Sequence, residues 1–353
     1  MNADQTLRDL VALPGPPGQE DRVRDYVVAR LETLGLTVQV DAKGNVLAGT
    51  PATLTGQPRV VVTAHLDEIA LMVKSIDGDG IIGVVSLGGA FPWKWGEGPV
   101  EILARNGVMV PGLLSLGSIH TTAPESVAQQ ARDGIVPGWN GVRILTGQDA
   151  EELADLGVRP GSRVVIARSR REIFALGGGL IASYFLDDRA DLLALLLAVE
   201  ATRGVPAFDG VLWAATASEE VGGEGALYLL GRLRPDVCVA LEIGPSSPDS
   251  PFPIGSQPTV WVSDTYAATD PRDLDLIDDA ARDTGLSPYF HVVTRGGSDA
   301  SCAAAQGLCA RPVTLAFAAE NSHGFEIMHR EAPQTLALLL VAYLRRLLGD
   351  ETG

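Results

Sequence analysis

The chain has 353 residues, of which 46% are hydrophobic and 20% are charged, a composition typical of a folded globular protein. Its formal net charge of −17 argues against nucleic acid as a partner, because phosphate binding requires a basic face. The longest apolar runs, Leu192–Val199 and Leu336–Leu344, are shorter than the roughly 18 residues of a membrane span, which argues against a membrane partner.

The start of the chain and its cysteines indicate the compartment. The first fifteen residues, MNADQTLRDLVALPG, lack the basic start and apolar run of a signal peptide. The three cysteines, Cys238, Cys302 and Cys309, are odd in number and lack zinc-finger spacing, so a disulfide framework is not expected. We therefore expect a soluble, cytoplasmic protein. Its length suits two domains, or one domain that carries a large insertion.

The first part of the chain predicts a helix followed by strands. Val23, Val27, Leu31 and Leu34 recur at helical spacing, and Gly35 ends the helix. Residues 58–64, with the sequence PRVVVTA, predict a buried strand. From about residue 74 to 166, glycine-rich strand-like pieces predict a small β-rich inserted domain, with one short helix near 149–156.

After residue 170 helix and strand patterns alternate. Helices are predicted at 188–204, 224–233, from about 271, and at the C-terminus, and strands are predicted at 210–217, 236–244, 288–294 and 312–317. This alternation predicts an α/β layer with a mostly parallel sheet. We expect a catalytic α/β domain formed by residues 1–73 and 167–353, with residues 74–166 inserted into it.

Potential metal ligands follow the ends of several predicted strands, where open α/β sheets place their sites. Taken singly, each has an ordinary explanation: a histidine at a strand end is usually just hydrogen-bonded, an aspartate pair suits a helix N-terminus, and two glutamates suit a solvated loop. Glu242 is harder to explain, because an acid that closes an apolar run is costly to bury without a cation or a hydrogen-bond partner. The set is His65, Asp67, Asp187 with Asp188, Glu219, Glu220, Glu242 and His323.

Taken together, two imidazoles and three carboxylates from the strand ends of one sheet suit a pair of zinc-like ions. Three carboxylates and two divalent ions leave one positive charge, which a bridging hydroxide would neutralise. One glutamate of the pair Glu219–Glu220 is then available as the proton acceptor, because adjacent side chains point in different directions. His65 and Asp67 lie on one face of an extended strand, so Asp67 can orient the imidazole.

Four short segments in this order resemble a known family. The sequence contains HLDEI at 65–69, LDDR at 186–189, SEEVG at 218–222 and GGSDA at 296–300. Their order and spacing resemble the TET-type (tetrahedral) aminopeptidases, the glutamyl aminopeptidase, cellulase M or FrvX-like metallopeptidases. The resemblance spans nearly the whole chain. It implies the α/β fold of di-zinc peptidases (phosphorylase/hydrolase-like) with an inserted β-barrel-like domain.

The resemblance also implies roles for individual residues. Asp187 would bridge two metal ions, with His65 and Glu242 completing one site and Glu220 and His323 completing the other. Glu219 would act as the general base, and Asp67 would orient His65. The segment HGFE at 323–326 departs from the family pattern, so His329 is the alternative to His323 as the last ligand.

The function implied is that of an aminopeptidase that removes N-terminal residues from peptides with a two-metal-activated water. Zinc is the expected metal, with cobalt or manganese as alternatives, and the resemblance implies a homo-oligomer, a dodecamer. Three other functions stay open: a di-metal deacylase of N-acyl amino acids, a metal-free glycoside hydrolase, and a non-catalytic assembly protein. Arg295, just before the glycine pair, is expected either to contact substrate or to form a structural salt bridge.

Overall fold

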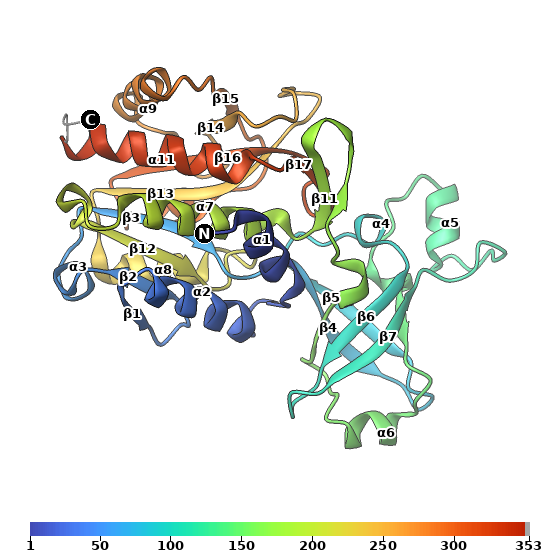
Figure 1. Ribbon diagram of the computed structural model, residues 1–353. Helices are drawn as coiled ribbons and strands as arrows, with labels where there is room; N and C mark the ends of the chain where they lie inside the picture. Colours follow the sequence, from blue (N-terminus) through green and yellow to red (C-terminus); the bar gives the residue numbers. More distant parts are fainter. Residues whose placement is uncertain (350–353) are drawn as a thin grey trace.

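The computed structural model describes residues 1–349 and consists of an eleven-stranded sheet between helices and a closed six-stranded barrel beside it (Figure 1). The strand order of the sheet is β1-β2-β12-β3-β13-β16-β17-β11-β10, and β14 pairs with β15 and with β16. The strands of the sheet are β1 (Thr37–Val40), β2 (Val46–Gly49), β3 (Val60–His65), β10 (Phe174–Ala175), β11 (Leu180–Tyr184), β12 (Val211–Thr216), β13 (Val237–Pro245), β14 (Pro258–Ser263), β15 (Tyr289–Val292), β16 (Arg311–Glu320) and β17 (Phe325–His329).

The centre of the sheet is parallel, as the alternating pattern predicts. Strands β12, β3, β13 and β16 are neighbours and run in the same direction, whereas β1, β2, β11 and β17 pair antiparallel at the edges. The predicted fold class is therefore confirmed. The alternation of helices and strands does not predict the antiparallel strands on either side of the parallel centre.

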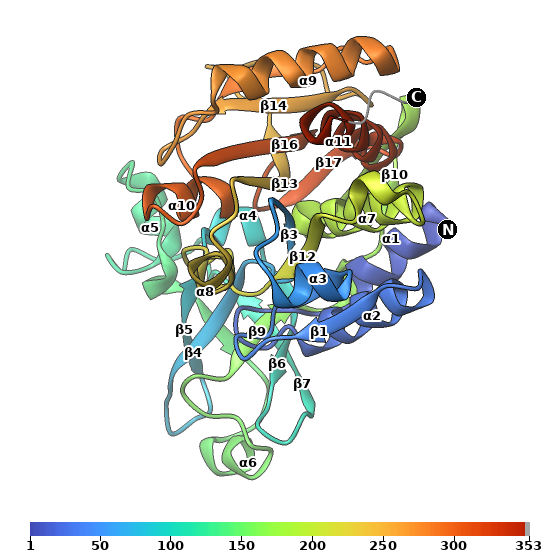
Figure 2. The same ribbon diagram turned by 90° about the vertical axis from the view of Figure 1, so that its left-hand side faces the viewer.

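Helices cover both faces of the sheet, so alternate residues of each central strand enter different cores (Figure 2). Val60 and Val62 of β3 pack into the larger core, and Val61 between them packs into the smaller one. The larger core is formed with α1 (Ala3–Ala12), α2 (Asp21–Thr33), α7 (Leu186–Thr202), α9 (Pro271–Thr284) and α11 (Ala332–Leu348). The smaller core is formed with α3 (Pro51–Thr55), α8 (Glu224–Leu233) and α10 (Asp299–Ala305).

The barrel has its own core around the fully buried Trp95, and that core extends to Tyr184 and Phe185 just before α7. The barrel therefore packs directly on the segment that enters α7. The division at residues 74 and 166 remains a prediction. The barrel strands and the short helices with them are β4 (Ala70–Ile76), β5 (Ile82–Leu87), α4 (Pro92–Trp95), β6 (Gly98–Leu103), β7 (Met109–Ser115), α5 (Val127–Arg132), β8 (Arg143–Leu145), α6 (Ala150–Asp155) and β9 (Arg163–Ile166).

The apolar runs Leu192–Val199 and Leu336–Leu344 lie in α7 and α11, which pack against each other and the sheet. Within residues 1–349, no helix is both long enough and apolar enough to cross a membrane.

The loop between β12 and α8 is held by a buried asparagine and a close backbone approach. Asn45 accepts a hydrogen bond from the Ala217 amide at 2.9 Å and donates one to the Gly225 carbonyl at 3.0 Å. A Cβ atom at Gly225 would lie 2.2 Å from the Ala217 carbonyl oxygen, so only glycine fits there. At Gly231, in the same helix, a Cβ would meet nothing within 4 Å.

We therefore expect opposite effects from alanine at these two glycines. Gly225→Ala should lower the free energy of unfolding by about 1–3 kcal/mol through overpacking. Gly231→Ala should raise it by up to about 1 kcal/mol, because alanine is the better helix former on an exposed face. Urea denaturation followed by circular dichroism measures both, and equal effects would contradict the crowding at Gly225.

Candidate metal centre

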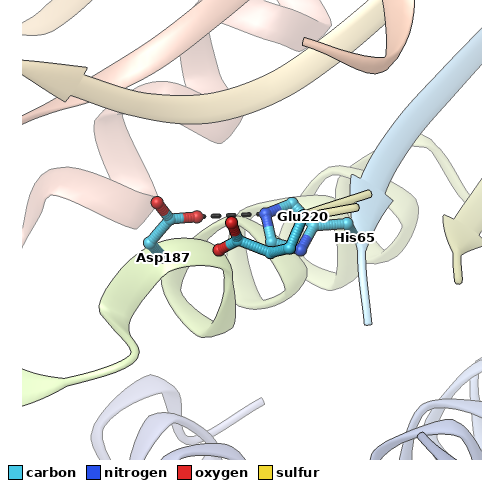
Figure 3. Close-up of side chains that lie close together, drawn as sticks. All are labelled: His65, Asp187 and Glu220. Carbon is cyan, nitrogen blue, oxygen red and sulfur yellow. Dashed lines mark hydrogen bonds and ion pairs between the residues drawn. The ribbon is translucent and has the colours of Figure 1, made fainter. Parts of the chain in front are cut away.

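Imidazole and carboxylate side chains converge at the carboxyl ends of the central parallel strands. His65 is the last residue of β3, Glu242 lies in β13, Glu219 and Glu220 follow β12, and Asp187 lies in the first turn of α7. His65, Asp187 and Glu220 lie side by side (Figure 3), and their ligand atoms are within 4.8 Å of one another. The same holds for His65, Glu219 and Glu242, so the two groups share the imidazole of His65.

Asp187 lies between two histidines. Its Oδ1 atom is 3.0 Å from Nε2 of His65, and its Oδ2 atom is 3.6 Å from Nε2 of His323. Nε2 of His323 is also 3.7 Å from Oε2 of Glu220. The two oxygens of one carboxylate therefore face two different imidazoles, the arrangement that a bridging ligand requires.

Asp67 connects three members of this group. Its Oδ1 atom accepts a hydrogen bond from the backbone amide of Glu219 at 2.8 Å, and its Oδ2 atom accepts one from the amide of Glu220 at 3.1 Å. Oδ1 is also 3.3 Å from Nδ1 of His65. Asp67 is fully buried, so these contacts fix the imidazole and both glutamates relative to one another.

The start of α7 holds the turn that follows β3. The Asp188 carboxylate accepts a hydrogen bond from the backbone amide of His65. Arg189 donates hydrogen bonds to the carbonyl oxygens of Leu66, at 2.7 Å, and Asp67, at 3.1 Å. Asp187 is therefore a potential ligand, and the two residues after it, Asp188 and Arg189, anchor the end of β3, which carries the potential ligand His65.

The barrel approaches the same group through two glycines that follow β5. A Cβ atom at Gly89 would lie 2.6 Å from Nδ1 of His323, and one at Gly88 would lie 3.1 Å from Oε2 of Glu220. The Gly89 carbonyl oxygen is 3.2 Å from Nδ1 of His323. Sequence reasoning did not single out these glycines. Their only signal is the Gly-Gly pair in the segment SLGGA.

His329 lies elsewhere. It is the last residue of β17, opposite Leu180, and its Nδ1 atom accepts a hydrogen bond from the Glu331 amide at 3.2 Å. A Cβ at Gly179 would lie 2.4 Å from its Nε2 atom. The structure therefore brings His323, and not the alternative His329, next to Asp187 and Glu220.

The pKa shifts of the side chains in this group are those expected where acids are buried close together, an arrangement that a cation would stabilise. Burial raises the pKa values of Glu219, Glu220 and Glu242, and the carboxylates around each of them raise them further. The pKa of His65 is also raised: burial alone would lower it, but the charges of Asp188 and the other carboxylates outweigh burial. Imidazole and carboxylate donors that crowd in this way fit a divalent ion, which would stabilise their metal-binding forms together.

The pKa of Asp187, by contrast, is lowered. Burial alone would raise its pKa, but the hydrogen bond from His65 and the charges of His65 and His323 lower it. Asp187 is thus the carboxylate of the group whose surroundings most favour the ionised form, as suits a ligand shared between two positive charges.

A cavity of about 430 Å³ opens beside this group. The acidic residues line one side of it, and Trp93 and Lys94 of the barrel line another. A reacting molecule in this cavity would therefore contact both parts of the structure.

Comparison with known sequences identifies the family. The profile of the M42 glutamyl aminopeptidases matches residues 44–339. The chain belongs to this family.

Members of the M42 family with assigned activities are similar to this chain over most of its length. A glutamyl aminopeptidase of Lactococcus lactis subsp. cremoris is 27% identical over 304 residues, which cover 84% of this chain and 82% of the relative. A lysyl aminopeptidase of Pyrococcus furiosus is 29% identical over 245 residues, 68% of this chain and 66% of the relative. The chain is accordingly a metallo-aminopeptidase, a hydrolase of peptide bonds, as the sequence motifs predict.

The fold is shared with solved peptidase structures. An aminopeptidase from Desulfurococcus kamchatkensis superposes with a TM-score of 0.84 at 25% identity, covering 99% of this chain and 98% of the other. A TET1 peptidase from Pyrococcus horikoshii gives a TM-score of 0.82 at 24% identity, with 97% and 98% covered. The resemblance to TET-type aminopeptidases is therefore confirmed, and the peptidase family assignment disfavours the glycoside hydrolase interpretation.

The contact between Gly89 and His323 generates a test of the barrel's part in the site. Gly89→Ala should push the imidazole away, because the new Cβ would lie 2.6 Å from Nδ1. We expect the affinity for Zn²⁺ of at least one binding step to fall about tenfold or more, the range seen when supporting contacts of a metal ligand are lost. Isothermal titration of chelator-stripped protein measures it.

Gly78→Ala is the matched control, since a Cβ there would meet nothing within 4 Å. Equal zinc affinities of the two variants would show that Gly89 does not support His323.

Proposed function

We propose that the enzyme holds two divalent metal ions in this centre and uses them to cleave the N-terminal residue from peptides. Zinc is the proposed metal, and cobalt or manganese also suits a mixture of imidazole and carboxylate donors. The observation that carries the proposal is the convergence of His65, Asp187, Glu220, Glu242 and His323 at one end of the sheet, beside the cavity.

In this proposal Asp187 would be shared by the two ions, His65 and Glu242 would complete one site, and Glu220 and His323 would complete the other. The positions of the two Asp187 oxygens, one toward His65 and one toward His323, support the bridging role. The contact between His323 and Glu220 supports their pairing. The pairing of His65 with Glu242 rests on the family resemblance and on their proximity within one group.

The ions, when bound, would supply Lewis-acid polarisation of the scissile carbonyl and acidification of the attacking water. Glu219 takes the proton from that water and passes it to the departing amine. Burial raises the pKa of Glu219, so its ionised carboxylate is a stronger proton acceptor than a solvated one. Asp67 anchors the Glu219 amide and the His65 ring, so it is a positioning residue that keeps the base aimed into the cavity.

We further propose that the enzyme is a cytoplasmic homo-oligomer. The similar TET1 peptidase of Pyrococcus horikoshii assembles into a tetrahedron or a large octahedral shell, which supports a dodecamer here. Exposed apolar side chains of the barrel and its loops, such as Phe91, Ile119 and Val136, are suited to contacts between subunits.

The assignment of the base is tested by Glu219→Gln. The variant keeps the size of the side chain but cannot accept the proton, so kcat should fall by about 10²–10⁴-fold. Metal content, measured by inductively coupled plasma mass spectrometry, should stay near two ions per chain. Glu224→Gln is the control, because Glu224 is exposed and, within residues 1–349, its side chain forms only a surface salt bridge with Lys43. A fully active Glu219→Gln enzyme would exclude Glu219 as the base.

The reaction class is tested with chelator-stripped enzyme and a panel of aminoacyl-p-nitroanilides, assayed before and after addition of Zn²⁺, Co²⁺ or Mn²⁺. We expect metal-restored hydrolysis of free-amine substrates and at least about a hundredfold slower hydrolysis of their N-acetylated forms. Preference for the acetylated substrates would instead favour a deacylase, and activity in the chelator would contradict the metal centre.

A further inference from the structure

A buried glutamate that is not one of the proposed ligands lies next to the candidate metal centre. Glu326 is the second residue of β17, is 1% exposed, and is the acid of the segment HGFE that departs from the family pattern. Its Oε2 atom accepts a hydrogen bond from the backbone amide of Asp187 at 3.0 Å, and its Oε1 atom accepts one from the amide of His323 at 2.9 Å. One carboxylate therefore joins the main chains of two proposed metal ligands.

The pairing of β11 with β17 explains how one side chain reaches both amides. The two strands are antiparallel, with Ser183 opposite Glu326. The chain leaves β11 toward Asp187 at the same end at which it enters β17 from His323. Glu326 therefore lies where the two segments that carry these ligands come closest to each other.

The hydrogen bond from the Asp187 amide has an ordinary explanation if it is taken alone. Asp187 lies in the first turn of α7, whose first amides have no acceptor within the helix, and Phe185 at the N-cap provides no side-chain bond. A carboxylate also suits the positive end of the helix dipole.

The hydrogen bond from the His323 amide is not explained by helix capping. His323 lies in a turn and has a φ of 60°, an uncommon conformation for a residue other than glycine, which persists only where the surroundings hold it. Within residues 1–349, the amides of Asp187 and His323 are the two hydrogen-bond donors to Glu326, one to each oxygen. The carboxylate thus aligns the turn of His323 with the start of α7.

The side chains of the two aligned residues converge on the candidate metal centre. Nε2 of His323 is 3.6 Å from Oδ2 of Asp187, and Nδ1 of the same ring faces the Gly89 carbonyl oxygen at 3.2 Å. The contact with Glu326 fixes where the main chain of His323 lies, and the contact with Gly89 fixes how its ring is turned. The imidazole is therefore held from both ends.

Glu326 repeats an arrangement that Asp67 forms elsewhere in the centre. Asp67, which is also buried, accepts hydrogen bonds from the amides of Glu219 and Glu220 on separate oxygens. Each of the two acids therefore holds a pair of neighbouring site residues by their main chains. Contacts of this kind preorganise a metal site, and their loss lowers metal affinity although the ligands themselves are unchanged.

We propose that Glu326 is a positioning residue that sets the metal affinity of one of the two sites, the site that Glu220 and His323 would complete. This inference rests on the proposed function. Loss of the contact would release the main chain of His323, a proposed ligand of that site alone. The other site would keep its own ligands, His65 and Glu242, and would weaken less.

Glu326→Gln tests the proposal. Glutamine keeps the size of the side chain, but its amide nitrogen is a donor and would face one of the two backbone amides. We expect one zinc-binding step of the chelator-stripped protein to weaken by about ten- to hundredfold, and the other by less than about threefold. Isothermal titration against a competing chelator measures both steps. Two unchanged steps in a folded variant would overturn the proposal.

A second substitution identifies the site that is affected. His323→Ala should remove the same binding step, so the addition of Glu326→Gln to His323→Ala should change the remaining step by less than about threefold. A tenfold or larger further loss would show that Glu326 acts on the other site, which would overturn the assignment.

Two readouts separate positioning from a general role in stability or in catalysis. The rise in Tm on addition of zinc, followed by circular dichroism, should be smaller in Glu326→Gln than in the wild type. The kcat at saturating zinc should stay within about threefold of the wild-type value, because the ligands and Glu219 are intact. An unchanged zinc-induced rise in Tm, or a kcat still reduced at saturation, would contradict the positioning role.

Hydrogen–deuterium exchange of the wild-type protein keeps the proposal testable if the variant does not fold. The amides of Asp187 and His323 should be protected in the chelator-stripped protein, since their acceptor belongs to the chain and not to the metal. Mass spectrometry with fragmentation of the peptides measures this. Exchange at the rate of exposed amides in the metal-free protein would overturn the proposal.

Glu320→Gln is the matched control. Glu320 is the last residue of β16, lies opposite Ile327 of β17, is exposed, and within residues 1–349 forms no side-chain hydrogen bond or ion pair. The control removes the same charge from the same end of the sheet, so its zinc affinities should equal those of the wild type. An equal loss would mean that net charge, and not the contact with the amides, sets the affinity, and would overturn the proposal.

The wild-type protein distinguishes failure of this inference from failure of the proposed function. Two zinc-binding steps and peptide cleavage in the wild type, with unchanged affinities in Glu326→Gln, would overturn this inference alone. A wild-type protein that binds no metal and cleaves no substrate would overturn the proposed function and this inference with it.

Discussion

The arrangement of the candidate metal centre depends on one buried ionic cluster, that of Glu68 with two arginines. Arg171 and Arg189 both donate to its carboxylate, and all three side chains are at most 1% exposed. Arg189 belongs to the first turn of α7, and Arg171 follows the last strand of the barrel. Glu68 stands where the chain leaves the sheet for the barrel, so this contact joins the outgoing and returning segments to the helix that carries Asp187. Charges this deeply buried must stay paired, since removing one partner from a buried pair typically costs about 3–5 kcal/mol.

At the same end of the sheet, acids with several hydrogen-bond donors lie beside acids whose ionised forms are unfavourable. Amide and guanidinium donors fully occupy Asp67 and Glu68, whereas the glutamates around the cavity have raised pKa values because burial and like charges oppose their ionisation. Asp188 and Asp191, fully buried behind them, keep carboxylate oxygens without hydrogen-bond partners within the described chain. The apolar cores therefore offset the cost of burying these acids, which a bound cation would stabilise. Such a local conflict is typical of a functional site.

Much of this could be predicted from the sequence because parallel strands place their carboxyl ends together. His65, Glu219, Glu220 and Glu242 come together for that reason, and the apolar strand patterns located them. The choice between His323 and His329 could not be made from pattern, since one shortly precedes β17 and the other ends it, and only tertiary contacts distinguish them. The support from Gly89 was missed because it joins residues 234 positions apart in the chain. The antiparallel strands β11 and β17 were also missed, because they do not alternate with helices.

The spread of the donor side chains along the chain has a consequence for how activity begins. They run from His65 to His323, and the barrel loop that touches His323 lies between them. A chain still emerging from the ribosome, or one truncated before residue 323, lacks a donor and the contact that seats it. The proposed donor set is therefore complete only after nearly the entire polypeptide has been made and folded.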